Sequence, residues 1–232
     1  MDHVYHARSV IILPALPTSV LSRPRGCVGC CSHHDQRTTY STIFRSKGRE
    51  NCLCSMSTVP APTNMSAYHV CTKSNRSVFL RSIDYPEIST QYTAHTTNTT
   101  VARFSPSGFY VASGDVSGTV RVWDCKGEGA TKGEYHIIAG RINDIAWDGD
   151  SQRIIAVGDG KERFGHCITA DSGNTVGEIS GHSSQVNCVS IRQQRPLRAA
   201  TGSDDTNIVF YHGAPFKFNT SLQGKHLSLI HI

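Results

Sequence analysis

The residue types best suited to bind a metal are concentrated in the first 56 residues. They are Cys27, Cys30, Cys31, His33, His34, Cys52 and Cys54. Thiolate and imidazole groups are the donors that tetrahedral zinc prefers. Their spacing matches no standard zinc finger, however, and the flanking residues show no ββα or zinc-ribbon pattern. We therefore expect no metal site and no cofactor.

The sequence also lacks the common motifs of catalysis. It has no G-x-S-x-G nucleophile elbow, no G-x-x-x-x-G-K-[ST] phosphate loop and no H-E-x-x-H metalloprotease motif. The acidic pair Asp204-Asp205 lies between two strand-like runs, where Asp is favoured because its side chain makes local hydrogen bonds in turns. These observations predict a protein that is not an enzyme.

Charge and hydropathy argue against nucleic acid and membrane as partners. Residues 1–56 carry +4 of the formal net charge of +5, so the remaining 176 residues are nearly neutral and predict no basic face for nucleic acid. The one apolar stretch that resembles a signal sequence, 9–21, is interrupted by Pro14 and Pro17, and no run of 18 apolar residues occurs. Residues 1–56 show no sustained period, and we expect them to be disordered or outside the domain.

From Tyr68 onward the sequence consists of short β-branched and aromatic runs separated by turn residues, which predicts an all-β fold. The runs repeat: Gly114, Gly158 and Gly202 follow one another at a constant step of 44 residues. Large apolar residues keep nearly the same spacing, at Phe104, Trp147 and Ile191. A period of about 40–45 residues with four short strands is typical of a blade of a β-propeller.

Single residues within the repeats narrow the fold further. They are His95, in TAH, His182, in SGH, and Trp123-Asp124, which closes RVWD. These residues resemble the Gly-His and Trp-Asp pairs of the WD-repeat family. The resemblance implies that the His, a turn Asp such as Asp204 and the Trp form a buried hydrogen-bond network, so we expect these residues to be structural. In the repeat between them, Ala170 replaces the Trp and Gly140-Arg141 replaces Gly-His.

Longer phrases narrow the resemblance. They are SPSGFYVASGDVSGTVRVWD (105–124), GRINDIAWDGDSQRIIAVGDGKERFG (140–165), RPLRAATGSDDTN (195–207) and GAPFKF (213–218). Together they are similar to the first propeller of the actin-interacting protein 1 family. The resemblance implies a cytoplasmic protein of the actin cytoskeleton, built from two seven-bladed propellers. It also implies binding to actin filaments decorated with cofilin, and promotion of their severing and disassembly.

The chain departs from that family in length. We expect an incomplete WD-repeat propeller at 57–222, with about three to four blades of a seven-bladed ring, at 57–95, 96–139, 140–180 and 181–222. The tail 223–232 falls outside the family pattern, and a sequence artefact is one interpretation of it. Two alternatives to the actin function stay open: a generic WD-repeat scaffold, and a truncated product without function.

The charged loop 158–165 is the best candidate for a partner contact. It is longer than a tight hairpin turn, and it carries Phe164 beside Lys161, Glu162 and Arg163. An aromatic residue flanked by charges is a common protein-contact hot spot. Asp150, in the preceding turn, is expected to add a charge to the same rim. The alternatives are that Phe164 folds back onto its own blade and that Asp150 only forms the turn.

Overall fold

The structure, a computed structural model, describes residues 43–45, 52–55, 68–73, 76–82, 89–125 and 129–223. Over these ranges the regular elements are 17 strands in four antiparallel sheets, and the all-β fold predicted from the sequence is confirmed. Within the same ranges there is no helix that could cross a membrane.

Within each sheet, strands that are consecutive in the sequence lie next to each other. The first sheet contains β1 (Ile43–Arg45), β2 (Cys52–Ser55), β3 (Tyr68–Lys73), β4 (Val78–Ser82) and β5 (Ser89–Tyr92). The second contains β6 (Thr99–Phe104), β7 (Tyr110–Asp115), β8 (Thr119–Asp124) and β9 (Thr131–His136). The third contains β10 (Gly140–Trp147), β11 (Arg153–Gly160), β12 (Gly165–Thr169) and β13 (Thr175–Glu178). The fourth contains β14 (Val186–Ile191), β15 (Arg198–Ser203), β16 (Ile208–His212) and β17 (Lys217–Leu222).

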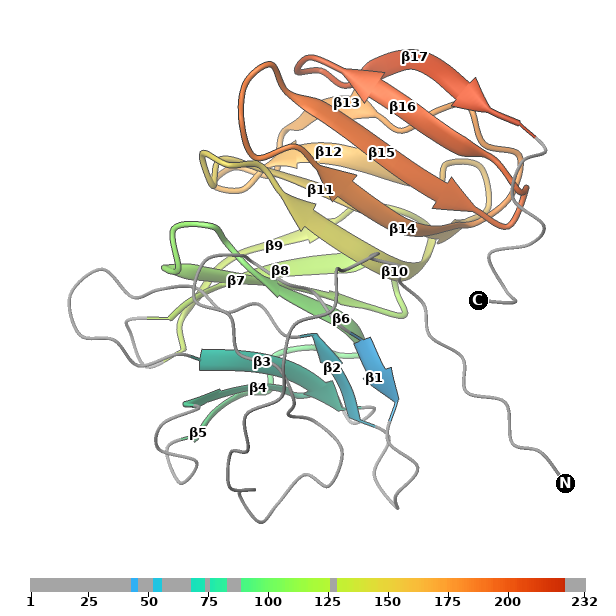
Figure 1. Cartoon of the computed structure of the whole chain (residues 1–232). Coiled ribbons are helices and arrows are strands. Elements are labelled where there is room, and N and C mark those ends of the chain that lie inside the picture. The colour runs from blue at the N-terminus through green and yellow to red at the C-terminus, as the bar shows by residue number, and fades with distance from the viewer. Residues whose placement is uncertain are drawn as a thin grey trace, which may run out of the picture.

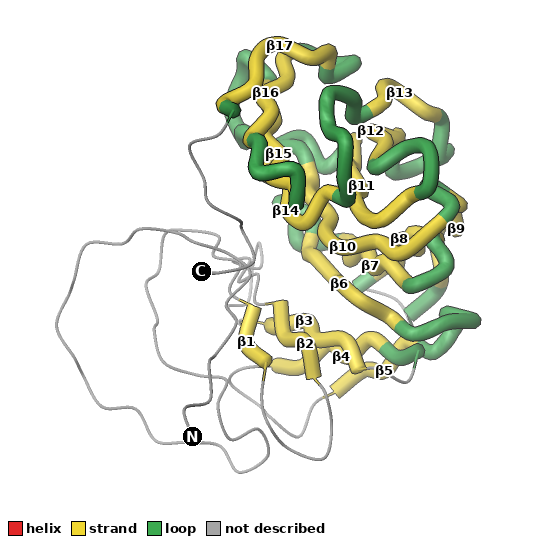
Figure 2. Tube along the Cα trace, turned by 90° about the vertical axis from the view of Figure 1, so that its right-hand side faces the viewer, coloured by secondary structure: helices red, strands yellow, loops and turns green. Residues whose placement is uncertain are grey.

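The four sheets stack face to face in chain order. Figure 1 shows the first sheet at one end of the stack and the fourth at the other, and Figure 2 shows the same succession from the side. The first strands of the second, third and fourth sheets, β6, β10 and β14, lie next to one another. This arrangement is part of a β-propeller, in which each blade is a four-stranded antiparallel sheet.

The apolar cores lie between successive sheets, because the middle strands are buried on both faces. Val111 and Trp123 of the second sheet pack toward the first sheet, in a cluster with Val70 and Val78. The alternate residues of the same strands, such as Val122, pack toward the third sheet. A third cluster joins the third and fourth sheets. Side chains that alternate across a strand thus supply two cores at once.

A β-bulge recurs where the innermost two strands of the last three sheets pair. The register shifts between Thr99 and Val101, between Ile142 and Asp144, and between Val186 and Cys188. The bulged residue of one sheet reaches the next sheet: Thr100 Oγ1 donates to Ile142 O (2.6 Å), and Asn143 Nδ2 donates to Val186 O (3.0 Å). A bulge re-aims one side chain, and here it re-aims a hydrogen-bonding group across the sheet interface.

A buried ion pair joins three sheets near these bulges. Arg103 NH2 lies 2.9 Å from Asp144 Oδ1, and both side chains are less than 10% exposed. The second oxygen of Asp144 accepts a hydrogen bond from Val189 N of the fourth sheet, at 3.1 Å. The charge of Asp144 is therefore paired on one side and hydrogen-bonded on the other, which a carboxylate at this depth requires.

The start of the domain differs from the expectation that residues 1–56 lie outside it. Strands β1 and β2 fall within that segment, and β2 pairs with β3 in the first sheet. There β2 and β3 both contact β6, and β1 pairs with the other edge of β2. The physical reason is that β3 offers a free edge, which a short strand such as CLCS can complete. The other three sheets lie within 96–139, 140–180 and 181–222.

We predict that Asp144→Ala destabilises the chain by roughly 3–5 kcal/mol, because it removes the buried carboxylate that pairs with the Arg103 guanidinium. Urea denaturation followed by tryptophan fluorescence measures the change. Asp150→Ala is the control, since Asp150 and Arg195 form an exposed ion pair, with exposed fractions of 45% and 75%. The control should change the unfolding free energy by less than about 1 kcal/mol. Similar losses from both variants would contradict this account of the interface.

Candidate protein-interaction site

A buried polar network holds one end of the second sheet. His95 Nδ1 lies 2.9 Å from Asp115 Oδ2, and His95 Nε2 lies 2.6 Å from Ser113 Oγ. Trp123 Nε1 donates to the same Ser113 oxygen at 2.7 Å. A carboxylate can only accept, so a neutral His95 that donates from Nδ1 and accepts at Nε2 satisfies every group in this chain of bonds. The network ties the loop before β6 to the turn after β7.

The acid of this network is strongly biased toward its charged form. Burial by itself would raise the pKa of Asp115, but hydrogen bonds from His95, Ser117 and Thr119 outweigh burial and hold that pKa well below its usual range. One oxygen, Oδ1, accepts from the backbone N–H groups of Ser117 and Thr119. Asp115 therefore shapes the turn and orients His95 at the same time.

The fourth sheet repeats the network with one change from the sequence prediction. His182 Nδ1 lies 3.0 Å from Asp205 Oδ2 and His182 Nε2 lies 2.7 Å from Thr201 Oγ1, and Tyr211 takes the place of the tryptophan. Asp204, which we expected in the network, instead accepts hydrogen bonds from Gln185 and Asn187. The prediction was wrong by one residue, because both acids occupy the same turn and only the second faces His182.

In the third sheet the network is replaced by apolar residues. Ile168 pairs with Ile154 as Trp123 pairs with Val111, so Ile168 and not Ala170 stands in the place of the tryptophan. Ile138 precedes the first bulge residue, Ile142, by the same four residues that separate His95 from Thr99. Ile138, Ala156 and Ile168 belong to one buried cluster. The expectation that Gly140-Arg141 replaces the Gly-His pair is therefore corrected to Ile137-Ile138.

The three glycines at the constant step are not equivalent. Gly114 pairs with Val101, and a Cβ there would lie 2.6 Å from Ile142 Cγ2 of the next sheet. Gly202 has the matching pairing, with Cys188, but in the third sheet this position is Val157, which pairs with Asp144. Gly158 lies one residue further, where a Cβ would meet Arg141 O at 1.8 Å. Gly158 is therefore required by close approach of the neighbouring strand.

The charged loop between β11 and β12 is two residues longer than its counterparts. Seven residues separate Val157 from its partner Gly165, whereas five separate Gly114 from Val120 and five separate Gly202 from Ile208. Lys161, Glu162 and Arg163 are exposed, and Arg163 Nε lies 3.8 Å from Glu178 Oε1. These three side chains form a charged projection at the end of the sheets that carries the His95 and His182 networks.

Phe164 and Asp150 lie elsewhere than the partner-contact hypothesis placed them. Phe164 is half-buried and packs against the cluster between the third and fourth sheets. Asp150 lies before β11, whereas Lys161 follows its end. Eight strand residues at about 3.3 Å each separate them by roughly 25 Å. Asp150 therefore does not share a rim with Lys161, Glu162 and Arg163, and its carboxylate is instead bound to Arg195.

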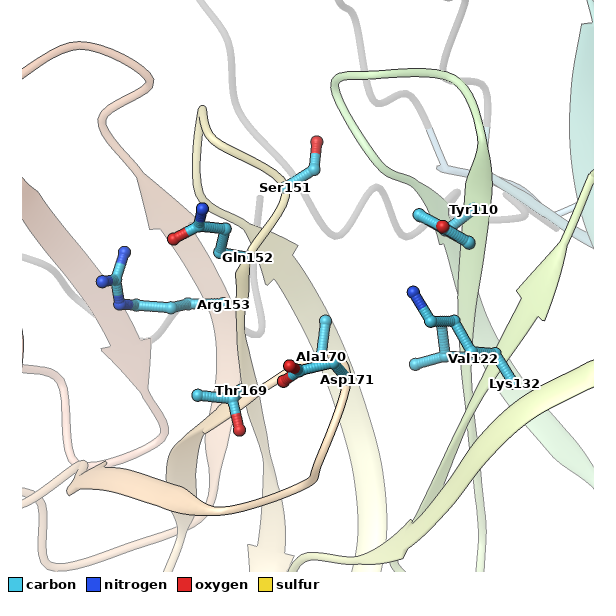
Figure 3. A pocket seen from close by; sticks show the side chains of 9 residues that line it. All are labelled: Tyr110, Val122, Lys132, Ser151, Gln152, Arg153, Thr169, Ala170 and Asp171. Atoms are coloured by element: carbon cyan, nitrogen blue, oxygen red, sulfur yellow. The ribbon is translucent and has the colours of Figure 1, made fainter.

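A cleft of about 390 Å³ opens between the second and third sheets, at the end opposite Lys161. Figure 3 shows Tyr110, Val122 and Lys132 on one wall and Arg153, Asp171 and their neighbours on the other. Lys132 Nζ lies over the Tyr110 ring, 4.1 Å from its centroid, and Arg153 is bound to Asp148. The cleft is polar on both walls, and two of its three charged side chains already have partners within the structure.

The cysteine and histidine group of the N-terminal segment cannot be compared with the prediction. Cys27, Cys30, Cys31, His33 and His34 lie outside the described residues. Cys52 and Cys54 lie in β2, but their side chains are not among those described. Among the described residues there is no group of three metal-ligating side chains.

We predict that Ser113→Ala lowers stability by about 1–3 kcal/mol, because it leaves buried ring nitrogens of His95 and Trp123 without a partner. The matched control is the reverse change at the equivalent position of the third sheet. Ala156→Ser puts a hydroxyl among apolar side chains and should also destabilise, by a similar amount. If Ala156→Ser were neutral or stabilising in urea denaturation, the third sheet would not have an apolar replacement of the network.

The low pKa of Asp115 predicts a loss of stability in acid. A depressed pKa contributes stability above the unfolded value of 3.8, and this contribution disappears as the pH falls through the folded value. We expect the unfolding free energy of the chain to drop between about pH 5 and pH 2, and to drop less in Asp115→Asn. Asp150→Asn should keep the full slope. Parallel slopes for all three proteins would show that Asp115 does not cause the acid sensitivity.

Comparison with known proteins gives a consistent assignment. The WD domain, G-beta repeat family matches residues 86–124 and 173–212. An uncharacterized WD repeat-containing protein of Schizosaccharomyces pombe is 58% identical over 188 residues, which is 81% of this chain and 30% of that protein. WD repeat-containing protein 1 of Mus musculus is 48% identical over 68% of this chain and 26% of its own length. Actin-interacting protein 1 of Drosophila melanogaster is 49% identical over 63% of this chain and 24% of its own length.

The chain spans between 24% and 30% of the length of these three relatives. The two family matches contain the whole of the His95 and His182 networks, with Trp123 and Tyr211 near their ends. The chain thus carries WD repeats, folds as part of a β-propeller, and is homologous to WD repeat-containing protein 1 and actin-interacting protein 1.

Proposed function

We propose that this chain is an actin-filament binding module that acts without catalysis and promotes cofilin-dependent severing and disassembly of filaments. The observation that carries the proposal is its 49% identity, over 148 residues, to a protein named actin-interacting protein 1. We also propose that it acts in the cytoplasm, on the actin cytoskeleton. Because the chain covers about a quarter of that relative, the activity of the whole relative is part of the proposal.

The charged projection Lys161, Glu162 and Arg163 supports a contact with such a partner. All three side chains are exposed, and the loop that carries them is anchored by Phe164 in the core beside it. An anchored loop keeps its exposed charges in place, so less side-chain entropy is lost on binding. Asp150, at the opposite end of the sheet, could meet the same partner only if that partner extended around the edge of the sheets.

The test is co-sedimentation of the full chain with actin filaments, with and without cofilin. We expect more chain in the pellet with cofilin-decorated filaments than with bare filaments. Lys161→Glu should weaken this binding about two- to fivefold, since a charge at the rim of an interface contributes modestly. Lys132→Glu is the matched control, because it reverses another exposed lysine, at the other end of the sheets, and it should have no effect.

Phe164→Ala is a poor probe of the contact. The half-buried ring belongs to the cluster between two sheets, so its loss lowers stability as well as any binding. Equal sedimentation with bare and decorated filaments would contradict the cofilin dependence. No sedimentation with either would remove the actin function and favour a generic WD-repeat scaffold.

A further inference from the structure

The third sheet contains a buried histidine with an unpaired ring nitrogen. His166 of β12 is 8% exposed, and its Nδ1 has no hydrogen-bond partner among the described residues. Its neighbour across the strands is Ala156 of β11, which belongs to the apolar cluster between the second and third sheets. Cross-strand neighbours share a face, so His166 also faces the second sheet. A buried polar group without a partner is costly, and its presence here calls for an explanation.

The position of His166 is equivalent to that of Arg121 in the second sheet. Arg121 pairs with Glu134 across β8 and β9, and His166 pairs with Glu178 across β12 and β13. In both sheets the register of these two strands shifts directly after the next residue, so the two pairs occupy the same place in their sheets. A base therefore faces a glutamate at this place in both sheets, but only the arginine is permanently charged.

The two glutamates have different ion-pair partners. In the second sheet Glu134 Oε1 lies 2.7 Å from Arg121 NH2, across the strands. In the third sheet Glu178 Oε1 instead lies 3.8 Å from Arg163 Nε, which belongs to the charged projection. That distance is beyond hydrogen-bonding range, so charge attraction alone holds Arg163 there. Glu178 thus has two basic neighbours: Arg163, which is always charged, and His166, whose charge depends on pH.

The surroundings of His166 keep it neutral at neutral pH. Burial lowers the pKa of His166, the carboxylate of Glu178 raises it, and the guanidinium of Arg163 lowers it. Among the described residues, no further charge contributes to this balance. The cluster on the side of the second sheet includes Tyr135, which burial keeps neutral by raising its pKa. A neutral imidazole does not compete for a carboxylate, so Arg163 keeps its partner.

We propose that His166 is a proton-dependent switch that holds or releases Arg163. When the imidazole takes up a proton from solvent, the imidazolium pairs with the carboxylate of Glu178, as Arg121 pairs with Glu134 in the second sheet. Arg163 then loses its counter-charge and becomes a free cation of the charged projection. The consequence for filaments rests on the proposed function, because Arg163 belongs to the surface proposed as the actin contact.

The first test follows His166 and Arg163 in the full chain by NMR, between about pH 7.5 and pH 5. We expect the imidazole to titrate with a midpoint below its usual pKa of 6.5, and the Nε resonance of Arg163 to move with the same midpoint. Arg163→Gln should raise the midpoint and Glu178→Gln should lower it, because they remove an unfavourable and a favourable charge. Arg195→Gln is the control, since it removes an arginine that is 75% exposed at the other end of the sheets, and it should leave the midpoint unchanged.

Glu178→Gln also separates a switch from a simple effect of charge. The charge of a protonated His166 would by itself shift the Arg163 resonance, so the movement is measured again in Glu178→Gln. We expect most of the movement to be lost there, because the ion pair that protonation breaks is already absent. The proposal is overturned if the Arg163 resonance stays still while His166 titrates, or if it moves equally in Glu178→Gln. Unfolding of the chain before His166 takes up a proton would also overturn it.

The second test measures filament binding at a single pH, so that actin and cofilin are the same in every sample. His166→Arg places a permanent cation opposite Glu178, as in the second sheet. It should strengthen co-sedimentation with cofilin-decorated filaments about two- to fivefold at neutral pH, because the freed Arg163 adds to the attraction expected of Lys161. His166→Gln stays neutral and should bind like the unmodified chain.

The two tests fail separately. If the NMR titration shows the switch but no variant sediments with filaments, only the actin function is removed. If His166→Arg folds and binds no more tightly than His166→Gln, the switch does not control the contact. Should His166→Arg fail to fold, Glu178→Gln replaces it in the second test, since it also releases Arg163 and should strengthen sedimentation in the same way.

Discussion

Every middle sheet of this chain is apolar on both faces, and this constraint governs the rest of the structure. A sheet with two apolar faces cannot be stable in water alone, so each must be covered by the sheet before it and the sheet after it. The hydrogen bonds from Thr100 and Asn143 to the next sheet, and the contact of Asp144 with both Arg103 and Val189, fix how the sheets are stacked. Burial drives the stacking, and these polar contacts select one register because a slipped sheet would leave them unpaired at low dielectric.

At the end of the sheets that carries the His95 and His182 networks, equivalent positions are polar in one sheet and apolar in another. In the second sheet, His95, Ser113 and Trp123 form a chain of hydrogen bonds. In the third sheet, Ile138, Ala156 and Ile168 fill the same space with apolar contacts. In the first arrangement both ring nitrogens of His95 and the Trp123 indole nitrogen have partners, and in the second these three positions are apolar. Only the first arrangement fixes directions, since a hydrogen bond is directional and an apolar contact is not. Mixing the two, with one polar residue among apolar partners, would be worse than either.

The fold could be predicted from the sequence because alternation and period are properties of single strands and of whole repeats. Which residues occupy equivalent positions in different sheets could not be predicted, and the pairing of the strands shows why. The turn after β11 is two residues longer than its counterparts, so the step from Trp123 to Ile168 is 45 residues and the step from Ile168 to Tyr211 is 43. A constant step of 44 residues therefore pointed to Gly158 where the structure has Val157.

The orientation of single side chains could not be predicted either. Nothing in the pair Asp204-Asp205 indicates which acid faces His182, because that depends on the bend of the turn. The charged loop could be predicted from its unusual sequence, GDGKERFG. The burial of Phe164 could not, because it depends on packing against the neighbouring sheet.

The longer turn after β11 occurs in the one sheet of the last three that lacks the His–acid pair. In the second and fourth sheets, Asp115 and Asp205 bond both the turn and a histidine, so a turn of that kind must stay short and close to the sheet. In the third sheet no such bond restrains the turn, and the place of Asp115 is taken by Gly158. The extra residues can then project into solvent, while Phe164 packs into the core and anchors the loop from the other side. The third sheet has Gly158 where the second has Asp115, and with this change the sheet lacks the polar network and has the longer turn that exposes Lys161, Glu162 and Arg163. The interior of the third sheet is thereby linked to the surface that we propose as the actin contact.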